Sequence, residues 1–359
     1  MSRLFSLVGT PSPAFYTTLN VVKALATAVI GEHDVVCANT MVELGDRLSG
    51  LSTPPERCVI LYSDYPQPDV LPAFTAIDAP LVICADDFLT IAHFSVVWRE
   101  YGGVDAARSA SMGLVNIEPL ISAPPRSSMI VDDTNVVLGE LVSRLARLYG
   151  LSVDEAARQA IRSALGQSAS EDETLKAYAA RTQPEPRNAR SILDGRSPLE
   201  TELLDLLAPH YGPIARGRRL ERLEWPPFAL LRPDFPDRLT VGPIDLTGPA
   251  RFIYYGPYFA LPRGRWRAEL ILEVSDCYSD NQIAIDVVSG GVLAAVKAKL
   301  PAQGVYSCEL AFAIWAPSNP VEIRLQLLTG AIEGMLMLRS IRLNRVAPPA
   351  RGGDGSGAS

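Results

Sequence analysis

The chain is 359 residues long, and at roughly 150 residues per domain this length predicts two or three domains. Hydrophobic residues make up 48% of the chain and charged residues 20%, which is the composition of a folded globular protein and excludes disorder of the whole chain. The formal net charge of -7 disfavours a protein whose main task is to bind nucleic-acid phosphates, so we expect no nucleic-acid partner.

Five cysteines are spread along the chain without a CxxC motif or a Cys/His group with zinc-ligand spacing, so we expect no metal site. An odd number of cysteines without a disulfide framework is typical of a reducing compartment. The first apolar run ends at Gly9, which is too short for a secretory signal, and no apolar segment reaches the length of about 18 residues that a membrane span needs. We therefore expect a cytoplasmic protein that does not span a membrane.

From the start to about residue 165, short apolar runs alternate with segments of helical periodicity. Apolar residues on consecutive positions suit strands that are buried on both faces of a parallel sheet. The expected strands are 4–8, 34–37, 58–62, 81–84 and 128–131. The expected helices are 14–30, 41–48, 70–76, 88–99 and 134–148. This alternation predicts an α/β domain with a doubly wound parallel sheet over residues 1–165.

Residues 166–236 are expected to form a helical linker region. The stretch up to about residue 195 is polar and weakly periodic, which is typical of a linker or a loosely packed helical arm. A helix is predicted after it, because Ser197 suits the N-cap, Pro198 suits the first helical position and leucines form one stripe. Gly212 and Pro213 are expected to end this helix.

After residue 236 the hydrophobic period changes to two. Alternating segments lie between turn signals that contain glycine, proline or asparagine, at 265–274, 282–288, 306–312, 321–327 and 335–343. Several strands at near-even spacing predict an antiparallel β-sandwich, or jelly roll, over residues 237–347. The last segment, 348–359, contains glycine, proline, alanine and serine without large apolar residues, and we expect it to be a disordered tail.

The turn between the first strand and the first helix is the first candidate site. It contains Gly9, Thr10, Pro11 and Ser12. In such a turn, backbone N–H groups and the positive end of the helix favour a bound phosphate or sulfate. The second glycine and the lysine of a Walker A loop are missing, however, and the turn does not fit GxGxxG. Two interpretations remain open: an anion site, or an ordinary connection in which Thr10 or Ser12 caps the helix.

The end of the fourth strand is the second candidate site. Asp86 and Asp87 follow the strand, and His93 lies on the helix after them. Ligands bind at the carboxyl ends of strands in parallel sheets, so His93 is a candidate general base with Asp86 or Asp87 as its orienting carboxylate. The alternative is a pair of capping carboxylates beside a packed histidine.

The strand, the Gly9 to Pro13 loop and the helix, together with the later Asp86, resemble the layout of the bacterial sulfotransferase family. That family opens with a loop of the type Gly-x-Pro-Arg-Ser-Gly-Thr and has a later Arg-Asp-Pro strand end. Here Ser12 stands where the loop arginine is expected, and Ala85 replaces the later arginine. The resemblance implies a degenerate P-loop type of domain, with phosphoadenosine phosphosulfate as the cofactor if the domain is active. A degenerate, non-catalytic relative is the alternative.

The predicted sandwich carries many aromatic residues. Sugars present flat C–H faces that stack on aromatic rings, while their hydroxyls need carboxylate and guanidinium partners. The candidate ligand-binding residues are Asp245, Arg251, Tyr255, Tyr258, Trp266 and Trp315. The segment from about 243 to 346 resembles jelly-roll accessory domains of carbohydrate-binding type, which implies a glycan or glycoconjugate partner. The alternative is a structural sandwich whose aromatic residues form its core.

The two resemblances favour a sulfotransferase-like protein, active or catalytically degenerate, that acts in the assembly or modification of bacterial surface polysaccharide. The alternative is a non-enzymatic carbohydrate-binding or protein-interaction module. In that version the α/β domain is a docking platform, and only the sandwich recognises a ligand.

Overall fold

Residues 4–50, 58–76, 79–132, 134–166, 168–183, 188–235, 239 and 241–346 are described by a computed structural model, and the segment 348–359 lies outside them. The chain divides into two units. The first, here called the α/β unit, comprises Met1–Leu220, Tyr258–Pro262 and Pro317–Pro320. The second, the sandwich unit, comprises Glu221–Pro257, Arg263–Ala316 and Val321–Ser359. The domain boundaries at 165, 236 and 347 stay predictions.

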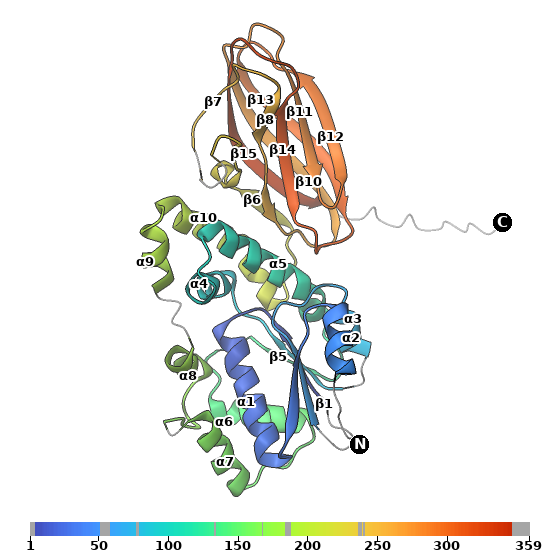
Figure 1. The fold of residues 1–359 in the computed structure, drawn as a ribbon, viewed down its shortest axis with the longest axis vertical. Coiled ribbons are helices and arrows are strands. Elements are labelled where there is room, and N and C mark those ends of the chain that lie inside the picture. The colour runs from blue at the N-terminus through green and yellow to red at the C-terminus, as the bar shows by residue number, and fades with distance from the viewer. Residues whose placement is uncertain are drawn as a thin grey trace, which may run out of the picture. The chain divides into compact units, whose positions relative to one another are not determined.

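The α/β unit contains a parallel five-stranded sheet in the order β2-β3-β1-β4-β5 (Figure 1). Its strands are β1 (Leu4–Gly9), β2 (His33–Cys37), β3 (Cys58–Ser63), β4 (Leu81–Cys84) and β5 (Ser128–Val131). The central strand β1 pairs Leu7 with Tyr62 on one side and with Val82 on the other. All five expected strands are confirmed. The apolar runs predicted them because a central strand of a parallel sheet is covered on both faces.

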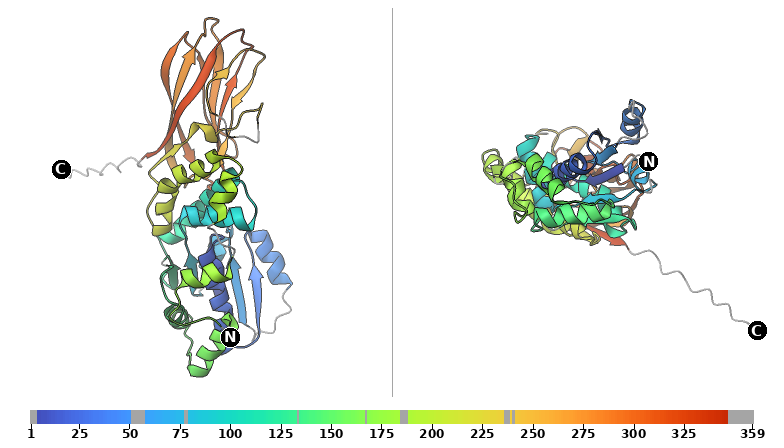
Figure 2. Two further views of the ribbon diagram at one scale, coloured as in Figure 1. Left: turned by 90° about the vertical axis from the view of Figure 1, so that its left-hand side faces the viewer. Right: turned by 90° about the horizontal axis from the view of Figure 1, so that it is seen from below.

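Helices surround this sheet. They are α1 (Pro13–Val29), α2 (Met41–Ser49), α3 (Leu71–Ala76), α4 (Phe88–Trp98), α5 (Gly103–Ser122), α6 (Leu138–Leu148), α7 (Glu155–Leu165), α8 (Leu175–Thr182), α9 (Asn188–Asp194) and α10 (Pro198–Tyr211), followed by the 3-10 helix η1 (Gly212–Arg216). Helix α1 packs against α6, α7 and α8, whereas α4 packs against α5, α9 and α10 (Figures 1 and 2). The second group lies at the carboxyl end of the sheet (Figure 1).

Several helix starts follow directly from the sequence. Ser12 caps α1 by accepting a hydrogen bond from the Phe15 N–H, and Thr40 caps α2 in the same way from Glu43. Helix α10 begins at Pro198, as expected. Helix α5 was not predicted. It is rich in alanine, serine and glycine and is buried on most of its surface, so its sequence shows no clear apolar stripe.

The sandwich unit consists of antiparallel strands, so the expected β-sandwich after the α/β region is confirmed. One sheet has the order β13-β10-β15-β6, with β7 beside β15, and the other includes β12-β11-β14-β8. The strands of this region are β6 (Arg222–Trp225), β7 (Ile244–Asp245), β8 (Arg251–Tyr254), β9 (Pro257–Phe259), β10 (Gly264–Ser275), β11 (Gln282–Val288), β12 (Val292–Lys299), β13 (Gly304–Ile314), β14 (Val321–Leu327) and β15 (Met335–Val346), and the 3-10 helix η2 spans Pro227–Ala229.

Strict alternation builds the core of the sandwich unit. On β11, Ile283, Ile285 and Val287 are buried, and the residues between them are partly exposed. Trp225 on β6 and Trp266 on β10 are fully buried. Strand β6 lies inside the range expected to be helical. It pairs with the last strand, β15, and its four residues are too few to show a period in the sequence.

Candidate functional site

The loop after β1 is closed to solvent. Thr10 and Ser12 are both 0% exposed. A Cβ atom added to Gly9 would lie 2.6 Å from the carbonyl oxygen of Cys84, so the glycine is required for close packing of two strand ends. On the other side, the Thr10 methyl group would lie 3.1 Å from a Cβ atom on Gly113 of α5. The side chains of this loop are therefore buried, and α5 packs against Thr10.

The positive end of α1 already has a negative partner, the side chain of Asp86. The Ala14 N–H donates a hydrogen bond to Asp86 Oδ2 at 3.3 Å, and the Ser12 hydroxyl also hydrogen-bonds this carboxylate. A carboxylate is favoured here for the same reason as a phosphate, because free N–H groups and the helix dipole point at it. The carboxylate of Asp86 therefore lies at the helix end where a bound anion would be held.

Burial sets the protonation behaviour of Asp86. The residue is 6% exposed, and burial raises the pKa of its carboxyl from 3.8 to about 6. The hydrogen bonds from Ser12 and Ala14 act in the opposite direction, because they stabilise the ionised form, while the charge of Asp87 raises the pKa further. The carboxyl of Asp86 therefore titrates near pH 6 in the folded protein.

The environment of His93 combines burial with nearby charges of both signs. It is half-buried on α4, and burial lowers the pKa of its imidazole. The nearby positive charge of Arg190 lowers the pKa further, whereas Asp205 and Asp87 raise it. Arg190 itself forms an ion pair with Asp205 at 2.6 Å. The charges around His93 thus come mainly from α9 and α10, and the assignment of His93 and Asp86 as a base and its orienting group stays a prediction.

Asp87 is a helix cap, as one of the two interpretations expected. Its side chain accepts hydrogen bonds from the Thr90 N–H at 3.1 Å and from the Thr90 hydroxyl at 2.7 Å. These contacts start α4. The structural interpretation is therefore confirmed for Asp87.

A polar cluster that the sequence did not reveal lies at the ends of β2 and β3. Asp64 accepts hydrogen bonds from the Tyr16 hydroxyl at 2.5 Å and from the Asn39 amide at 3.1 Å. The side-chain oxygen Oδ1 of Asn39 accepts in turn from the Ser63 hydroxyl at 2.6 Å. Burial, followed by the charge of Asp64, raises the pKa of Tyr16 far above its usual range. The cluster ties two strand ends to α1, and no single sequence motif joins residues so far apart in the chain.

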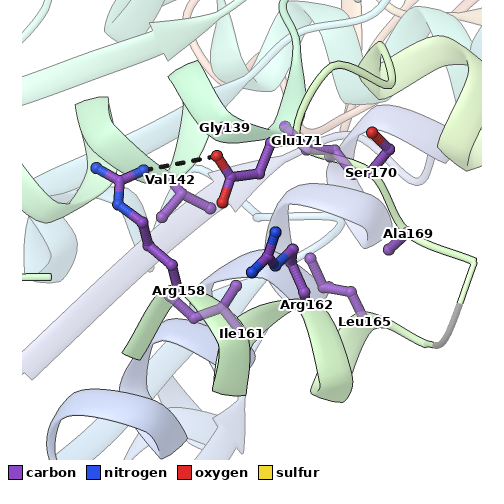
Figure 3. Close-up of a pocket in the computed structure, with 10 residues that line it drawn as sticks. Gly139, Val142, Arg158, Ile161, Arg162, Leu165, Ala169, Ser170 and Glu171 are labelled. Carbon is purple, nitrogen blue, oxygen red and sulfur yellow. Dashed lines mark ion pairs between the residues drawn. The ribbon is translucent and has the colours of Figure 1, made fainter. Parts of the chain in front are cut away.

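A hollow between α6, α7 and the segment 169–171 is lined by apolar side chains and two arginines (Figure 3). Arg158 lies at its rim, with a guanidinium nitrogen 3.8 Å from Glu171 Oε2. The hollow has a volume of about 20 Å³, which is room for about one water molecule. It is too small for an organic ligand.

The aromatic candidates of the second half have unlike environments. Trp266 is fully buried in the sandwich core, so its ring does not reach a sugar at the surface. Tyr258 belongs to the α/β unit, where the guanidinium of Arg108 lies 5.1 Å from its ring centroid. Tyr255 forms a β-bridge with Leu231. Trp266 therefore fits the alternative interpretation, in which the aromatic residues form the core of the sandwich.

The polar candidates, Asp245 and Arg251, stabilise their own loop. Asp245 accepts a hydrogen bond from the Thr247 N–H at 2.8 Å, and hydrogen bonds from Thr247 lower the pKa of its carboxyl. The guanidinium of Arg251 donates to the carbonyl oxygens of Leu246, Pro249 and Asp245. Both side chains thus hold the backbone before β8, and their role in ligand binding stays a prediction.

Trp315, another of the candidate ligand-binding residues, has a ring that faces solvent. It follows β13 and is 68% exposed. The guanidinium of Arg263, just before β10, lies 5.6 Å from the centroid of this ring. The two residues are adjacent because Ile314 pairs with Gly264 at the shared end of β13 and β10. An exposed ring with a cation beside it is suited to binding a flat, hydroxylated ligand.

A second exposed ring lies on the outer face of the other sheet. Phe252 on β8 is 40% exposed, and the guanidinium of Arg324 lies 5.6 Å from its ring centroid. Arg324 makes two hydrogen bonds to Asp286, at 2.8 and 2.7 Å. This bidentate pair fixes the arginine beside the ring. The sequence did not predict the exposure of Phe252, because its strand is too short to reveal which face the residue lies on.

Neither a candidate metal site nor a membrane-spanning helix is found among the described residues. These residues contain no group of three or more His, Cys, Asp or Glu side chains that could hold a metal ion. Within the same ranges, every helix is too short or too polar to cross a lipid bilayer. All five cysteines are free thiols.

Comparison with known proteins gives only distant similarities. No family model and no curated protein matches the sequence. Among solved structures, the mouse sulfotransferase SULT7A1 complexed with PAP is 10% identical, with a TM-score of 0.34, over 57% of this chain and 82% of that one.

Two sugar-binding structures are similar to a smaller part of the chain. The C-terminal domain of EclA, described as a sugar-binding protein, is 10% identical, with a TM-score of 0.24, over 29% of this chain and 79% of its own. The carbohydrate-binding module TmCBM61, solved with beta-1,4-galactotriose, is 15% identical, with a TM-score of 0.22, over 29% of this chain and 69% of its own. Scores this low establish neither a family nor an activity for this chain.

Proposed function

We propose that this protein is a non-catalytic glycan-binding protein. In this proposal the sandwich unit carries the binding surface, and the α/β unit is a sulfotransferase-like scaffold whose loop is closed. The single observation that carries the binding function is the ring of Trp315, which is 68% exposed beside Arg263. Exposing a large aromatic ring to water is unfavourable, and such rings are enriched at recognition surfaces. A role in bacterial surface-polysaccharide assembly stays part of this proposal.

The α/β unit supports a scaffold better than an enzyme. Sulfuryl transfer needs cationic donors to offset the charge on the departing phosphate. Ser12 stands where the resemblance places an arginine, and the carboxylate of Asp86 occupies the end of α1. A second negative group at the same helix end would be repelled by that carboxylate.

Isothermal titration of the full chain with adenosine 3′,5′-bisphosphate tests the scaffold half of the proposal. A sulfotransferase that binds this nucleotide serves as the positive control. We expect no heat of binding from this protein. Saturable binding at micromolar concentration would show that the loop opens, and the enzymatic alternative would then replace the scaffold.

A glycan array probed with the full chain tests the binding half, and titration with each bound oligosaccharide then compares variants. We expect Trp315→Ala to weaken binding about tenfold, equivalent to about 1.4 kcal/mol. Phe252→Ala is the matched control, because it removes another exposed ring of the same unit, and we expect unchanged affinity. A silent array overturns the glycan function. A loss in Phe252→Ala alone would move the site to the outer face of β8.

A further inference from the structure

The two sheets of the sandwich unit are separated along one side by an open cleft. Strand β12 is the edge of one sheet, and β13 is an edge of the other. Between them lies a cavity of about 360 Å³. This volume is within the range of roughly 300–1,000 Å³ that small-molecule sites occupy.

The cleft is open where Ala298 of β12 and Cys308 of β13 face inward, because both side chains are small. Residues directly opposite each other in a strand pair lie on the same face of the sheet. Ala298 is opposite the buried Ile283, and Cys308 is opposite the buried Leu270, so both point inward. Neither is large enough to close the gap above the core. Ala298 is in fact exposed, although it is on the inner face.

Tyr306 forms one side of the mouth. It is opposite Leu272 on the inner face, yet it is 40% exposed. Its hydroxyl donates a hydrogen bond to the carbonyl oxygen of Gln303 at 2.7 Å. The ring lies over Gly304, where an added Cβ atom would be 2.8 Å from the tyrosine oxygen. The ring is thus folded back along the strand, and the mouth stays open.

The floor of the cleft is apolar, and its rim is polar. Leu272 and Val274 of β10 face Ile283 and Ile285 of β11 across the floor, while Lys299, Ser307 and Glu309 lie among the residues at the rim. A sugar would lose hydrogen bonds to water on this floor without replacing them, which is unfavourable. A hydrocarbon chain gains free energy there, because it leaves water.

The rim supplies a cation. The Lys299 ammonium lies 2.9 Å from Asp280, but both side chains are more than 60% exposed. Such an exposed pair contributes little, so the ammonium can turn to a new anionic partner at small cost. Glu309, the rim carboxylate, lies 3.6 Å from the guanidinium of Arg267. The exposed cation of Lys299 therefore complements a negative group at the mouth.

We propose that this cleft binds a long-chain amphiphile, with its unbranched hydrocarbon chain between the two sheets and its anionic head group at Lys299. The site is separate from the proposed glycan surface. Trp315 adjoins the start of β10 at Gly264, whereas the cleft includes Leu272, and eight residues of strand span roughly 26 Å. The two functions therefore succeed or fail independently.

Titration of the full chain with octanoate, decanoate and dodecanoate, each below its critical micelle concentration, tests the chain-binding floor. We expect one saturable site whose affinity rises about fourfold for each added methylene. Ala298→Leu should weaken dodecanoate binding at least tenfold, because the larger side chain fills the mouth. Ala295→Leu is the matched control on the outer face of the same strand, opposite Asp286, and should bind normally. Equal affinities in the two variants, or no saturable binding, would overturn the proposal.

The head group is tested by charge. Lys299→Gln should weaken dodecanoate binding several-fold and leave dodecanol binding unchanged. Lys297→Gln removes a charge from the same strand at a residue that does not line the cleft, and it should change neither ligand. If Lys299→Gln affects both ligands equally, the assignment of the head group is wrong.

Cys308 gives an independent readout of location, because its half-buried side chain lines the cleft. Dodecanoate should slow the modification of Cys308 by N-ethylmaleimide at least threefold, as measured by mass spectrometry of the peptide. Cys37, which is half-buried in the α/β unit, should react at the same rate with and without ligand. If dodecanoate binds but Cys308 is not protected, the site lies elsewhere and the proposal fails.

Discussion

Candidate site residues have opposite environments in the two units: in the α/β unit Ser12 and Asp86 are buried and hydrogen-bonded, and in the sandwich unit Trp315 is exposed. In the α/β unit, Ser12 and Asp86 lie where strands end and helices begin, and there they hydrogen-bond each other and the start of α1. In the sandwich unit, Trp315 lies where a strand ends and its ring is left in solvent. The difference shows that the side chains at a strand end are open to a ligand only where no other element packs over them, as α5 packs over Thr10 after β1.

Replacing one buried and one exposed tryptophan by alanine tests which rings form the core of the sandwich unit. Trp266→Ala should lower the free energy of unfolding of the sandwich unit by about 3–5 kcal/mol, because it leaves a cavity in the core. Trp315→Ala should change it by less than about 0.5 kcal/mol, because the ring is exposed. Hydrogen exchange read by mass spectrometry measures each unit separately. Equal losses in the two variants would contradict the assignment of core and surface.

The pH dependence of the α/β unit tests whether Asp86 is part of its core. The pKa of this carboxyl is raised from 3.8 to about 6, so between these values the folded chain holds a proton that the unfolded chain releases. The contribution to stability is therefore full below about pH 4 and is lost as the pH rises to about 6. At 1.36 kcal/mol per pKa unit, the loss is about 3 kcal/mol.

Urea unfolding followed across this pH range should show that loss in the wild type. It should be absent in Asp86→Asn, whose amide does not titrate but keeps an oxygen that can accept from the Ala14 N–H. The opposite result is a free energy of unfolding that rises between pH 4 and 6 in the wild type but not in Asp86→Asn. It would mean that the fold stabilises the ionised carboxylate.

Gly9→Ala tests the closure of the loop. The added methyl group would lie 2.6 Å from the Cys84 carbonyl oxygen and from the ring of Phe15, so it should cost about 1–3 kcal/mol in the α/β unit. Gly45→Ala on α2 is the matched control, because its added methyl group meets no atom within 4 Å, and it should gain about 0.5–1 kcal/mol. Thermal unfolding measures both. Equal shifts would mean that the loop has room, as an open phosphate site has.

The smallest effect compares two helix caps. Thr40→Ala on α2 should cost about 1 kcal/mol, the usual loss of a cap at the surface. Ser12→Ala should cost about 2 kcal/mol, because it removes the same kind of cap from a buried site and also a hydrogen bond to Asp86. Chemical unfolding of the two variants gives the difference, and a cheaper loss at Ser12 would argue that the loop is open to water.

Local patterns predicted most of the fold and less of the site. The five parallel strands appear in the sequence because burial on both faces leaves continuous apolar runs, as in β4. Strand β12 was missed, because an edge strand that borders an open cleft keeps little apolar alternation. Asp64, Tyr16 and Asn39 were missed as a cluster, because the bonds that join them connect residues far apart in the chain.

Local patterns in the sequence predicted most of the strands and helices, since a strand buried on both faces, an alternating strand and a capped helix each leave such a pattern, but they did not predict α5, β6 or β12. Tertiary structure alone decided which polar and aromatic side chains are free for a ligand. Trp266 and Trp315 have the same chemistry, yet one is fully buried and the other 68% exposed. Asp86 turns toward α1 because the fold brings β4 beside β1. The exposure of a side chain and its hydrogen-bond partners depend on neighbours that are distant in sequence, so local sequence patterns do not reveal them.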